Sequence, residues 1–509
     1  MKKESRQLGA SLDLIAKSSV IVFLGIAVSK ALTYVYRILI ARSFDPEVYG
    51  LFALALMVVS IALMIAGIGL PDGLLRYLAF YRGKKRYRQI SYLFRSAFAA
   101  TLMTSLIIAI LLYMLAETIS LRIFHNSLLI PFIRFFSITI PFSVLASILL
   151  STLLAFEKVA WNSFLNNFLQ NFVKVMLLVI FIFLGLKIDA VIISYVMSAV
   201  LLFVAAYFVT RRLVPIVYRR QSLAAKEKSK VIREVLAYSW PIIFLGAIYT
   251  LFNWTDSFVI GYFMTARDVG FYNAAFTLLA LFGIAPEIFK QLFFPLIVKE
   301  FSRKNMLMIR ELSQQVSKWI FILNVPLFLM FFTFPGVIIN VVFGKEYLAA
   351  EGVLRILAVG GLLSSLSAML TNLLSMKGKS RLILANTIFI SFLDLVMNII
   401  LVPKYGLYGA AVSTTFNLIL LNVILFAEVK HYVGIVPLRR KMLRVAMVSL
   451  IPLAALFFIK HYVAVHLASL ILIAVLFAAF YLGLIVLTKC LDKHDWEIIA
   501  SFTSLFRKK

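Results

Sequence analysis

Charged and amide side chains lie inside stretches of the chain that are otherwise apolar, and their chemistry differs between the two halves of the sequence. In the N-terminal half, Lys30 and Arg37 are seven residues apart and therefore share one face of a helix. A polar stripe follows at Ser163, Asn167, Gln170, Asn171 and Lys174. Because this half has no acid deep in an apolar run, its cations and amides favour an anionic ligand such as a phosphate, whose oxygens accept charge-assisted hydrogen bonds.

The C-terminal half carries carboxylates instead. Asp256 shares a helix face with Tyr249 and Asn253. Two later runs add further oxygen and amide groups, at Thr387, Ser391, Asp394 and Asn398, and at Ser413, Thr414 and Asn417. Oxygen-rich groups with two carboxylates can hold Na⁺ or a proton. Small hydroxyl residues could also serve only as bridges between helices, but that explanation covers Asp256 and Asp394 poorly.

The elements that position these residues must be membrane-spanning helices. Of the 509 residues, 63% are hydrophobic and 14% are charged, against about 45–50% apolar and about 25% charged in soluble domains. This composition excludes a soluble enzyme, a disordered chain and a secreted disulfide scaffold. A bilayer-crossing helix needs roughly 20 apolar residues. Fourteen such runs occur, at about 16–41, 49–70, 94–116, 129–154, 161–185, 190–210, 235–263, 270–298, 316–343, 350–376, 381–402, 406–429, 442–461 and 466–488.

The basic residues predict how these runs cross the membrane. The net charge is +29, and 38 of the 51 Lys and Arg lie in the N-terminus or after even-numbered runs, against 8 after odd-numbered runs. The positive-inside rule then predicts an even number of spans in the cell membrane, with both termini in the cytoplasm. Nucleic-acid binding would need a contiguous basic surface, whereas this charge is divided among eight short segments. We therefore expect no nucleic-acid partner.

The position of each cation along its predicted span indicates whether its side chain can reach the membrane interface. Lys30 lies near the middle of its run, where its side chain cannot easily extend to the interface, so we favour a functional role for it. For Lys174 a functional role and a simple extension to the interface both stay open. The single cysteine, Cys490, and five scattered histidines offer no metal-ligand spacing, and we expect neither a structural metal nor a catalytic group.

An internal repeat organises the runs. Shifting the chain by 220 residues aligns run 1 with run 7 and run 6 with run 12, and it pairs Gly50 with Gly270. Since six is an even number, both halves enter the membrane in the same sense, as in a parallel pseudo-twofold repeat. We predict an all-α integral membrane protein of about 14 transmembrane helices. Its two six-helix lobes are 1–222 and 223–432, and 433–509 holds two further helices and a cytoplasmic tail.

Five connections between the runs carry recognisable motifs. They are Asp45-Pro46-Glu47-Val48-Tyr49-Gly50, Gly69-Leu70-Pro71-Asp72-Gly73-Leu74-Leu75-Arg76, Val269-Gly270-Phe271-Tyr272, Phe343-Gly344-Lys345-Glu346-Tyr347 and Val402-Pro403-Lys404-Tyr405-Gly406. In this order, over nearly the whole chain, they resemble the Wzx-type polysaccharide flippases of the multidrug/oligosaccharidyl-lipid/polysaccharide (MOP) flippase superfamily. The resemblance implies a central cavity between the lobes and a transporter rather than an enzyme.

The resemblance also implies a substrate and its binding residues. The substrate would be a polyprenyl-(pyro)phosphate-linked oligosaccharide, moved from the cytoplasmic to the outer leaflet by alternating access. We expect it to contact Lys30, Arg37, Arg76, Asn167, Asn171 and Lys174. Lipid II flippases of this superfamily bind a cation through an Asp of span 7, an Asp and an Asn of span 11 and a Thr of span 12. Asp256, Asp394, Asn398 and Thr414 match in type and span, although Asp precedes Asn in span 11 here.

Two alternatives stay open beside this expectation. One is a multidrug or organic-cation antiporter of the same superfamily, although such a substrate would prefer carboxylates in the first lobe. The other is a membrane-embedded polysaccharide polymerase or ligase, although the connections after odd-numbered runs are short for a catalytic loop. No cofactor is expected, and Na⁺ and H⁺ are the candidate coupling ions. The expected partners are membrane lipids and, from the same pathway, glycosyltransferases and a polymerase.

Overall fold

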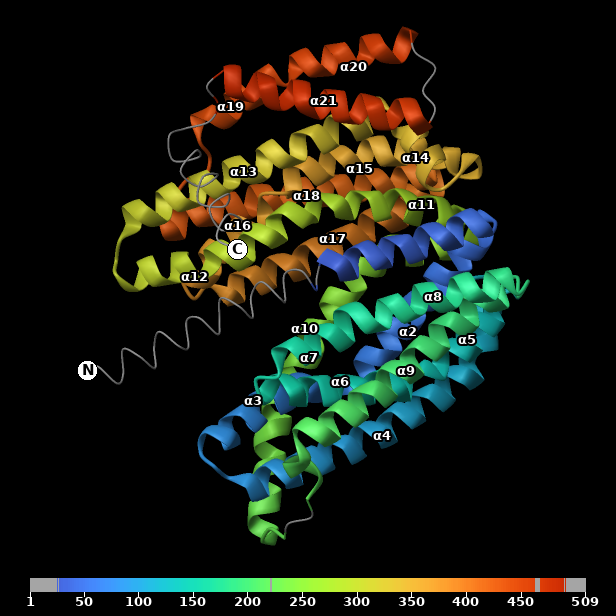
Figure 1. The fold of residues 1–509 in the computed structure, drawn as a ribbon, viewed down its shortest axis with the longest axis vertical. Helices are drawn as coiled ribbons and strands as arrows, with labels where there is room; N and C mark the ends of the chain where they lie inside the picture. Colours follow the sequence, from blue (N-terminus) through green and yellow to red (C-terminus); the bar gives the residue numbers. More distant parts are fainter. Residues whose placement is uncertain (1–24, 26, 220–221, 463–466, 489, 491–509) are drawn as a thin grey trace, which may run out of the picture. The chain divides into compact units, whose positions relative to one another are not determined.

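A computed structural model of the chain describes residues 25, 27–219, 222–462, 467–488 and 490 (Figure 1). The described residues form helices and connections, without strands. Twelve helices among them are long and apolar enough to cross a membrane. This confirms the prediction of an all-α protein that crosses the membrane many times.

The twelve helical spans correspond one by one to the predicted runs from the second to the thirteenth. They are Pro46–Gly67, Tyr87–Ile123, Leu129–Ala155, Val159–Phe183, Asp189–Leu213, Ala225–Phe263, Ala266–Lys290, Met306–Thr333, Lys345–Met376, Ser380–Tyr405, Leu407–Val433 and Arg440–Ile459. The first predicted run, 16–41, begins outside the described residues and is helical over 27–43. The last corresponds to α21 (Leu467–Leu487), and most of the predicted tail lies outside the described residues.

The chain divides into two compact units, Met1–Asn273 and Ala274–Lys509. After the first helix (27–43), the first unit contains α2 (Pro46–Gly67), α3 (Leu70–Gly83), α4 (Tyr87–Thr118), η1 (Ile119–Ile123), α5 (Leu129–Ser137), α6 (Thr139–Ala155), α7 (Val159–Ser163), η2 (Phe164–Leu169), α8 (Gln170–Phe183), α9 (Asp189–Leu213), η3 (Pro215–Tyr218) and α10 (Ala225–Phe263). The long helix α10 thus packs with the first unit, and the predicted lobe boundary at 222/223 stays a prediction.

Helix α11 (Ala266–Leu279) crosses from the first unit into the second. The second unit continues with η4 (Ala280–Gly283), α12 (Ile284–Ser302), α13 (Met306–Thr333), α14 (Pro335–Val342), η5 (Lys345–Ala350), α15 (Glu351–Ser364), α16 (Ser367–Met376), α17 (Ser380–Tyr405), α18 (Leu407–Glu428), η6 (Val429–Val433), α19 (Arg440–Val448), α20 (Leu450–Tyr462) and α21.

Helix α2 illustrates how the sequence begins and ends a span. Pro46 occupies the first turn, where its missing N–H costs nothing. The helix is apolar on every side, as expected of a membrane span. It ends where Ile68 and Gly69 adopt left-handed backbone conformations, with φ of 49° and 61°. A side chain at Gly69 would also overlap the backbone oxygen of Ser239, so both conformation and packing require glycine there.

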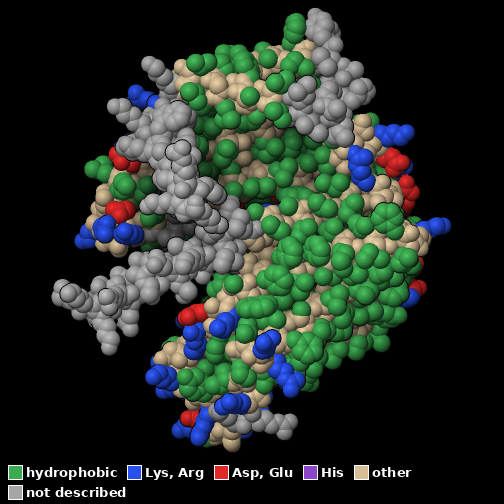
Figure 2. All heavy atoms as spheres, in the orientation of Figure 1, with side chains coloured by type: hydrophobic (Ala, Val, Ile, Leu, Met, Phe, Trp, Pro, Cys, Tyr) green, Lys and Arg blue, Asp and Glu red, His purple; other side chains and the backbone are tan. Residues whose placement is uncertain are grey.

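The surface is that of a protein surrounded by hydrocarbon. Met103, Ile107, Ile110 and Met114 on α4 are between 56% and 72% exposed, which water would disfavour over so continuous a face. Figure 2 shows a broad hydrophobic face on the first unit, with Lys and Arg gathered toward the ends of its helices. The interior of this unit is a separate apolar cluster that includes Leu74, Leu78 and Leu149.

The predicted 220-residue repeat appears in the contact between α2 and α11. The two helices begin at Pro46 and Ala266, which are 220 residues apart. A Cβ atom on Gly50 would overlap the backbone oxygen of Ala266, and a Cβ atom on Gly270 would overlap that of Pro46. Because the repeat pairs these same residues, each helix offers the other an identical contact, as at a twofold axis. The close crossing explains why both positions are glycine.

Candidate functional site

Lys174 on α8 is half-buried in a cage of aromatic rings in the first unit. Its ammonium lies 5.6 Å from the centre of the Tyr36 ring and 5.3 Å from that of Tyr195. A cation held over two ring faces is stabilised by about 0.5–2 kcal/mol for each ring. Within the described residues no carboxylate pairs with Lys174. Its charge is therefore held in place without being neutralised.

The rings of this cage are themselves fixed by the surrounding helices. The Tyr36 hydroxyl is 3.1 Å from the hydroxyl of Ser194 on α9. The Tyr195 ring stacks on Phe136, with centroids 4.4 Å apart. Arg37, which follows Tyr36, is close enough to Lys174 for the two positive charges to repel each other. The first helix, α8 and α9 thus hold two cations in one region, which favours an anion.

One amide of the polar stripe joins α8 to the first helix, and a second one bonds within its own helix. The amide nitrogen of Asn171 donates to the Ser29 hydroxyl at 2.9 Å, and the Thr33 hydroxyl is 3.4 Å from its oxygen. Asn167 donates to Ser163 at 3.1 Å. The predicted polar stripe is therefore a seam between two helices, in which Ser163 and Asn167 lie against Gly25 and Asn171 bonds to Ser29.

The helix that carries the stripe is irregular, which the sequence did not predict. Phe164–Leu169 is a π-helical turn, η2, between α7 and α8. Such turns insert a wider ring of backbone into a helix and occur frequently at functional sites. Asn167 lies inside this turn. The turn changes the register between Ser163 and Lys174, so regular helical spacing alone does not describe the seam.

The other predicted cations are placed less centrally. Lys30 is half-buried on the first helix, about 10 Å along the axis from Arg37, and it makes no ion pair with a described residue. Arg76 is exposed on α3, and its guanidinium lies 4.2 Å from the centre of the Tyr238 ring of α10. The structure therefore brings Arg37 and Lys174 together, joins Asn171 to Ser29 and Thr33 of the first helix, and places Arg76 in a different contact.

In the second unit, Asp394 is the centre of a buried polar network. The side chain is 3% exposed, and one carboxylate oxygen accepts from the Ser413 hydroxyl and from the Asn417 amide, both at 2.9 Å. Asn398, which is fully buried, donates to the Asp394 backbone oxygen at 3.0 Å and to the Ser413 hydroxyl at 3.2 Å. Helices α17 and α18 supply these four residues.

The network includes two residues of α18 that the resemblance did not name, Ser413 and Asn417. Their neighbour Thr414 is half-buried and donates to the backbone oxygen of Ala410 on its own helix at 3.0 Å. Asn417 leaves its side-chain oxygen buried and without a hydrogen-bond partner in the described structure. Buried oxygens of this kind suit a small cation. The sequence indicated Ser413 and Asn417 as polar residues of this span, and their spacing of four residues places both on one face of α18.

Asp256 lies in the first unit and has its own partner. It is 8% exposed and accepts a 2.6 Å hydrogen bond from the Tyr272 hydroxyl. Next to it, Asn273 donates to Ser257 at 3.0 Å. Helices α10 and α11 supply both pairs. Sequence reasoning did not assign a role to the Tyr272 hydroxyl, because a tyrosine in an apolar run is most often part of the core.

The repeat relates the two charged regions in an unexpected way. The 220-residue shift pairs Lys174 with Asp394 and Tyr36 with Asp256. The position that holds a cation in the N-terminal half thus holds an anion in the C-terminal half. This pair of equivalent positions carries opposite charges, which suits an anionic ligand in the N-terminal half and a cationic ligand in the C-terminal half.

Comparison with known sequences identifies the family. The sequence pattern of the polysaccharide biosynthesis protein family matches residues 15–299, more than half of the chain. The chain belongs to this family. It is 22% identical over 292 residues to an uncharacterized membrane protein of Methanocaldococcus jannaschii, covering 57% of each chain. It is 28% identical over 183 residues to the probable low-salt glycan biosynthesis flippase Agl15 of Haloferax volcanii, covering 36% of this chain and 38% of that protein. The matches thus span between about two fifths and three fifths of these relatives.

Solved structures establish the fold. The lipid II flippase MurJ in an inward closed conformation is similar with a TM-score of 0.72 and 16% identity, over 91% of this chain and 98% of that one. An inward-facing multidrug resistance MATE transporter of the MOP superfamily is similar with a TM-score of 0.65 and 15% identity, over 87% and 99%. The fold is that of MOP transporters, as the sequence motifs predicted.

Proposed function

We propose that this chain is a flippase of glycan biosynthesis that moves a polyprenyl-(pyro)phosphate-linked oligosaccharide across the cell membrane. The observation that carries the proposal is the caged Lys174 beside Arg37, in a polar seam between membrane helices. Phosphate oxygens accept charge-assisted hydrogen bonds from these cations, and Asn167 and Asn171 add neutral donors. Membership of the polysaccharide biosynthesis protein family supports a glycan as the cargo.

The direction and cycle follow from the same proposal. The basic residues place both termini in the cytoplasm, so the phosphate head enters from that side and leaves toward the outer leaflet. Lys30 lies at a different depth from Arg37, so it contacts the phosphate head either before or after Arg37 does. The apolar tail stays in the bilayer, and the protein alternates between two access states. Glycosyltransferases that build the oligosaccharide and a polymerase that consumes it are the partners this role implies.

We propose further that a small cation drives the cycle through the second unit. Asp394, Ser413, Asn417 and Asn398 offer buried oxygens around one carboxylate. Binding of Na⁺ or H⁺ there shifts the access equilibrium only by its difference in affinity for the two states. Asp256 and Thr414 keep their proposed role in cation binding, and Arg76 keeps its proposed role in substrate contact.

Reconstituted transport tests the proposal. Proteoliposomes with the purified chain receive a fluorescent polyprenyl-pyrophosphate-linked oligosaccharide in one leaflet, and an impermeant enzyme that cleaves the sugar reports its transfer. Transfer well above that of protein-free vesicles is the expected result. An organic-cation antiporter would instead accumulate a fluorescent cation in the same vesicles, and a polymerase would lengthen the glycan. Either of these outcomes without oligosaccharide transfer contradicts the flippase.

A further inference from the structure

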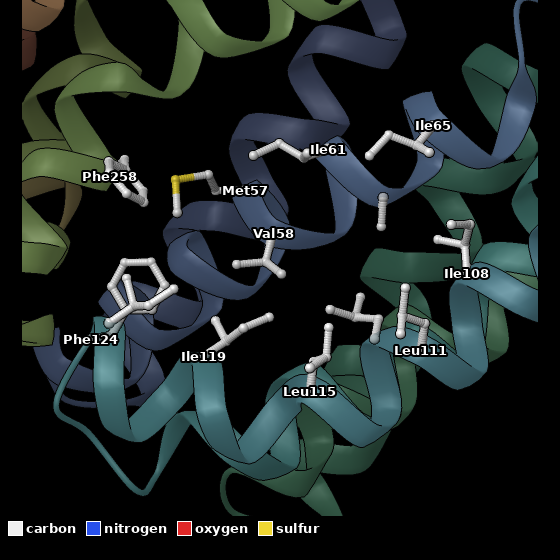
Figure 3. Close-up of a pocket in the computed structure, with 13 residues that line it drawn as sticks. Met57, Val58, Ile61, Ile65, Ile108, Leu111, Leu115, Ile119, Phe124 and Phe258 are labelled. Atoms are coloured by element: carbon white, nitrogen blue, oxygen red, sulfur yellow. The ribbon is translucent and has the colours of Figure 1, made fainter.

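The first unit contains an apolar slot that lies apart from the cationic seam. Its 13 lining residues come from α2, α4, η1, α10 and Phe124, which directly follows η1, whereas the seam belongs to the first helix, α8 and α9 (Figure 3). The cavity has a volume of about 270 Å³. Figure 3 shows Met57, Phe124 and Phe258 at one end and Ile65 and Ile108 toward the other. Carbon and one thioether line the whole slot, without a charged or amide side chain.

The shape and surroundings of the slot indicate a hydrocarbon chain. From Ile108 to Ile119 the wall of α4 rises about 16 Å, roughly half of a 30 Å hydrocarbon core. The slot lies between membrane spans and opens along Ile65, Leu111 and Phe258, which are 39–49% exposed. At that depth the surrounding medium is lipid, and a wall without donors or acceptors can bind only apolar atoms.

One end of the slot carries a charge that suits a lipid phosphate. Arg122 lies on the π-helical turn η1, between the lining residues Ile119 and Ile123. It is exposed, and within the described residues it has no ion-pair partner. The nearby Arg134, by contrast, is paired with Glu117 at 3.3 Å. Arg122 is thus a cation placed where a lipid chain in the slot would meet its head group.

We propose that this slot binds one acyl chain of a bilayer phospholipid, with the phosphate at Arg122. The chain lies along α4 between α2 and Phe258, and burial of its methylenes against Ile, Leu and Met side chains provides the affinity. The site belongs to the leaflet that η1 faces, which is the outer one if the termini are cytoplasmic. It is separate from the transported lipid, so the proposal stands whether or not the chain is a flippase.

Photolabelling of the intact protein tests this site. The chain is reconstituted in phosphatidylethanolamine vesicles that contain phosphatidylglycerol with a diazirine in its acyl chain, and labelled peptides are mapped after irradiation. Label concentrated in residues 108–124 is expected. Leu111→Trp, which fills the slot, should lower that label about tenfold. Ile110→Trp is the matched control, because Ile110 lies on the same helix with a comparable exposed fraction, 56% against 49% for Leu111, but does not line the slot.

Two further measurements decide the occupant. Arg122→Gln should weaken labelling by phosphatidylglycerol. It should leave the unfolding temperature unchanged, because Arg122 makes no hydrogen bond or ion pair with another described residue. Unlabelled phosphatidylglycerol should compete more effectively than unlabelled polyprenyl phosphate. Equal labelling of Leu111→Trp and the wild type would overturn the site. Preferential competition by polyprenyl phosphate would overturn the phospholipid and assign the slot to an isoprenoid chain.

Discussion

Replacing Asp394 by Asn tests whether the network of the second unit binds a coupling ion. The side chain is almost fully buried and accepts two hydrogen bonds of 2.9 Å, from Ser413 and Asn417. Asparagine keeps the size of the side chain and an oxygen for both donors, but it removes the negative charge. Hydrogen bonds to a charged group contribute about 1.5–3 kcal/mol and neutral ones about 0.5–1.5 kcal/mol. The variant therefore keeps its fold and loses the attraction for a cation.

The size of the effect follows from linkage. A cation at one hundred times its Kd stabilises the folded protein by about 2.7 kcal/mol. For a unit of 150–250 residues each kcal/mol raises the unfolding temperature by roughly 2–4 °C. The wild type should therefore gain about 5–11 °C in saturating Na⁺ if Na⁺ is the coupling ion. Asp394→Asn should gain nothing, because it lacks the carboxylate that the cation would neutralise.

The assay is thermal unfolding of the purified protein in detergent. Unfolding temperatures are compared in NaCl and in choline chloride at equal ionic strength, and again over a pH series in choline chloride to detect a proton instead. Ser391→Ala is the control, because its hydroxyl donates to the backbone oxygen of Thr387 on its own helix. The same response to Na⁺ or pH in Asp394→Asn as in the wild type would show that Asp394 does not bind the coupling ion.

Three further predictions follow from named contacts. Gly50→Ala should lower the unfolding temperature, since its Cβ meets a backbone oxygen and such overpacking costs about 1–3 kcal/mol; Gly67→Ala, where a Cβ meets no atom, should be neutral by the same measurement. Tyr272→Phe removes the 2.6 Å donor to Asp256 and should cost about 1–3 kcal/mol in denaturant unfolding; an unchanged midpoint would argue against that bond. Lys174→Met keeps an apolar stem in the aromatic cage but removes the charge, and should raise the half-saturating substrate concentration in the transport assay roughly 10–100-fold.

The sequence predicted the spans and the repeat because both depend on long patterns. Hydrocarbon excludes charge over about 20 residues at a time, so each span leaves a signal too long to arise by chance. The pairing of Gly50 with Gly270 was visible as an offset, and the structure supplies its reason in the reciprocal contact of two backbones. The choice of a glycine at each position is a packing requirement that the offset alone could not reveal.

The candidate site was predicted by residue type rather than by partner. Lys174 and Asp394 stood out because a charge inside a span is costly. The aromatic neighbours of Lys174 did not, since Tyr36 and Tyr195 are ordinary residues of apolar helices until the fold brings them together. The π-helical turn η2 has no strong sequence signature, and it changes which side chains share a face. The distances between side chains on different helices depend on how the helices pack, and a single sequence does not reveal that packing.

Binding of the phosphate of a lipid-linked oligosaccharide by the cations of the first unit can be measured through transport. Transfer of this lipid is compared in proteoliposomes for the wild type and for Lys30→Ala/Arg37→Ala, with a matched unfolding temperature as proof of folding. Each lost charge-assisted hydrogen bond weakens phosphate binding by about 1.5–3 kcal/mol. Transfer by the double variant should fall at least about tenfold at subsaturating substrate. Transfer at the wild-type rate would mean that Lys30 and Arg37 do not bind the phosphate.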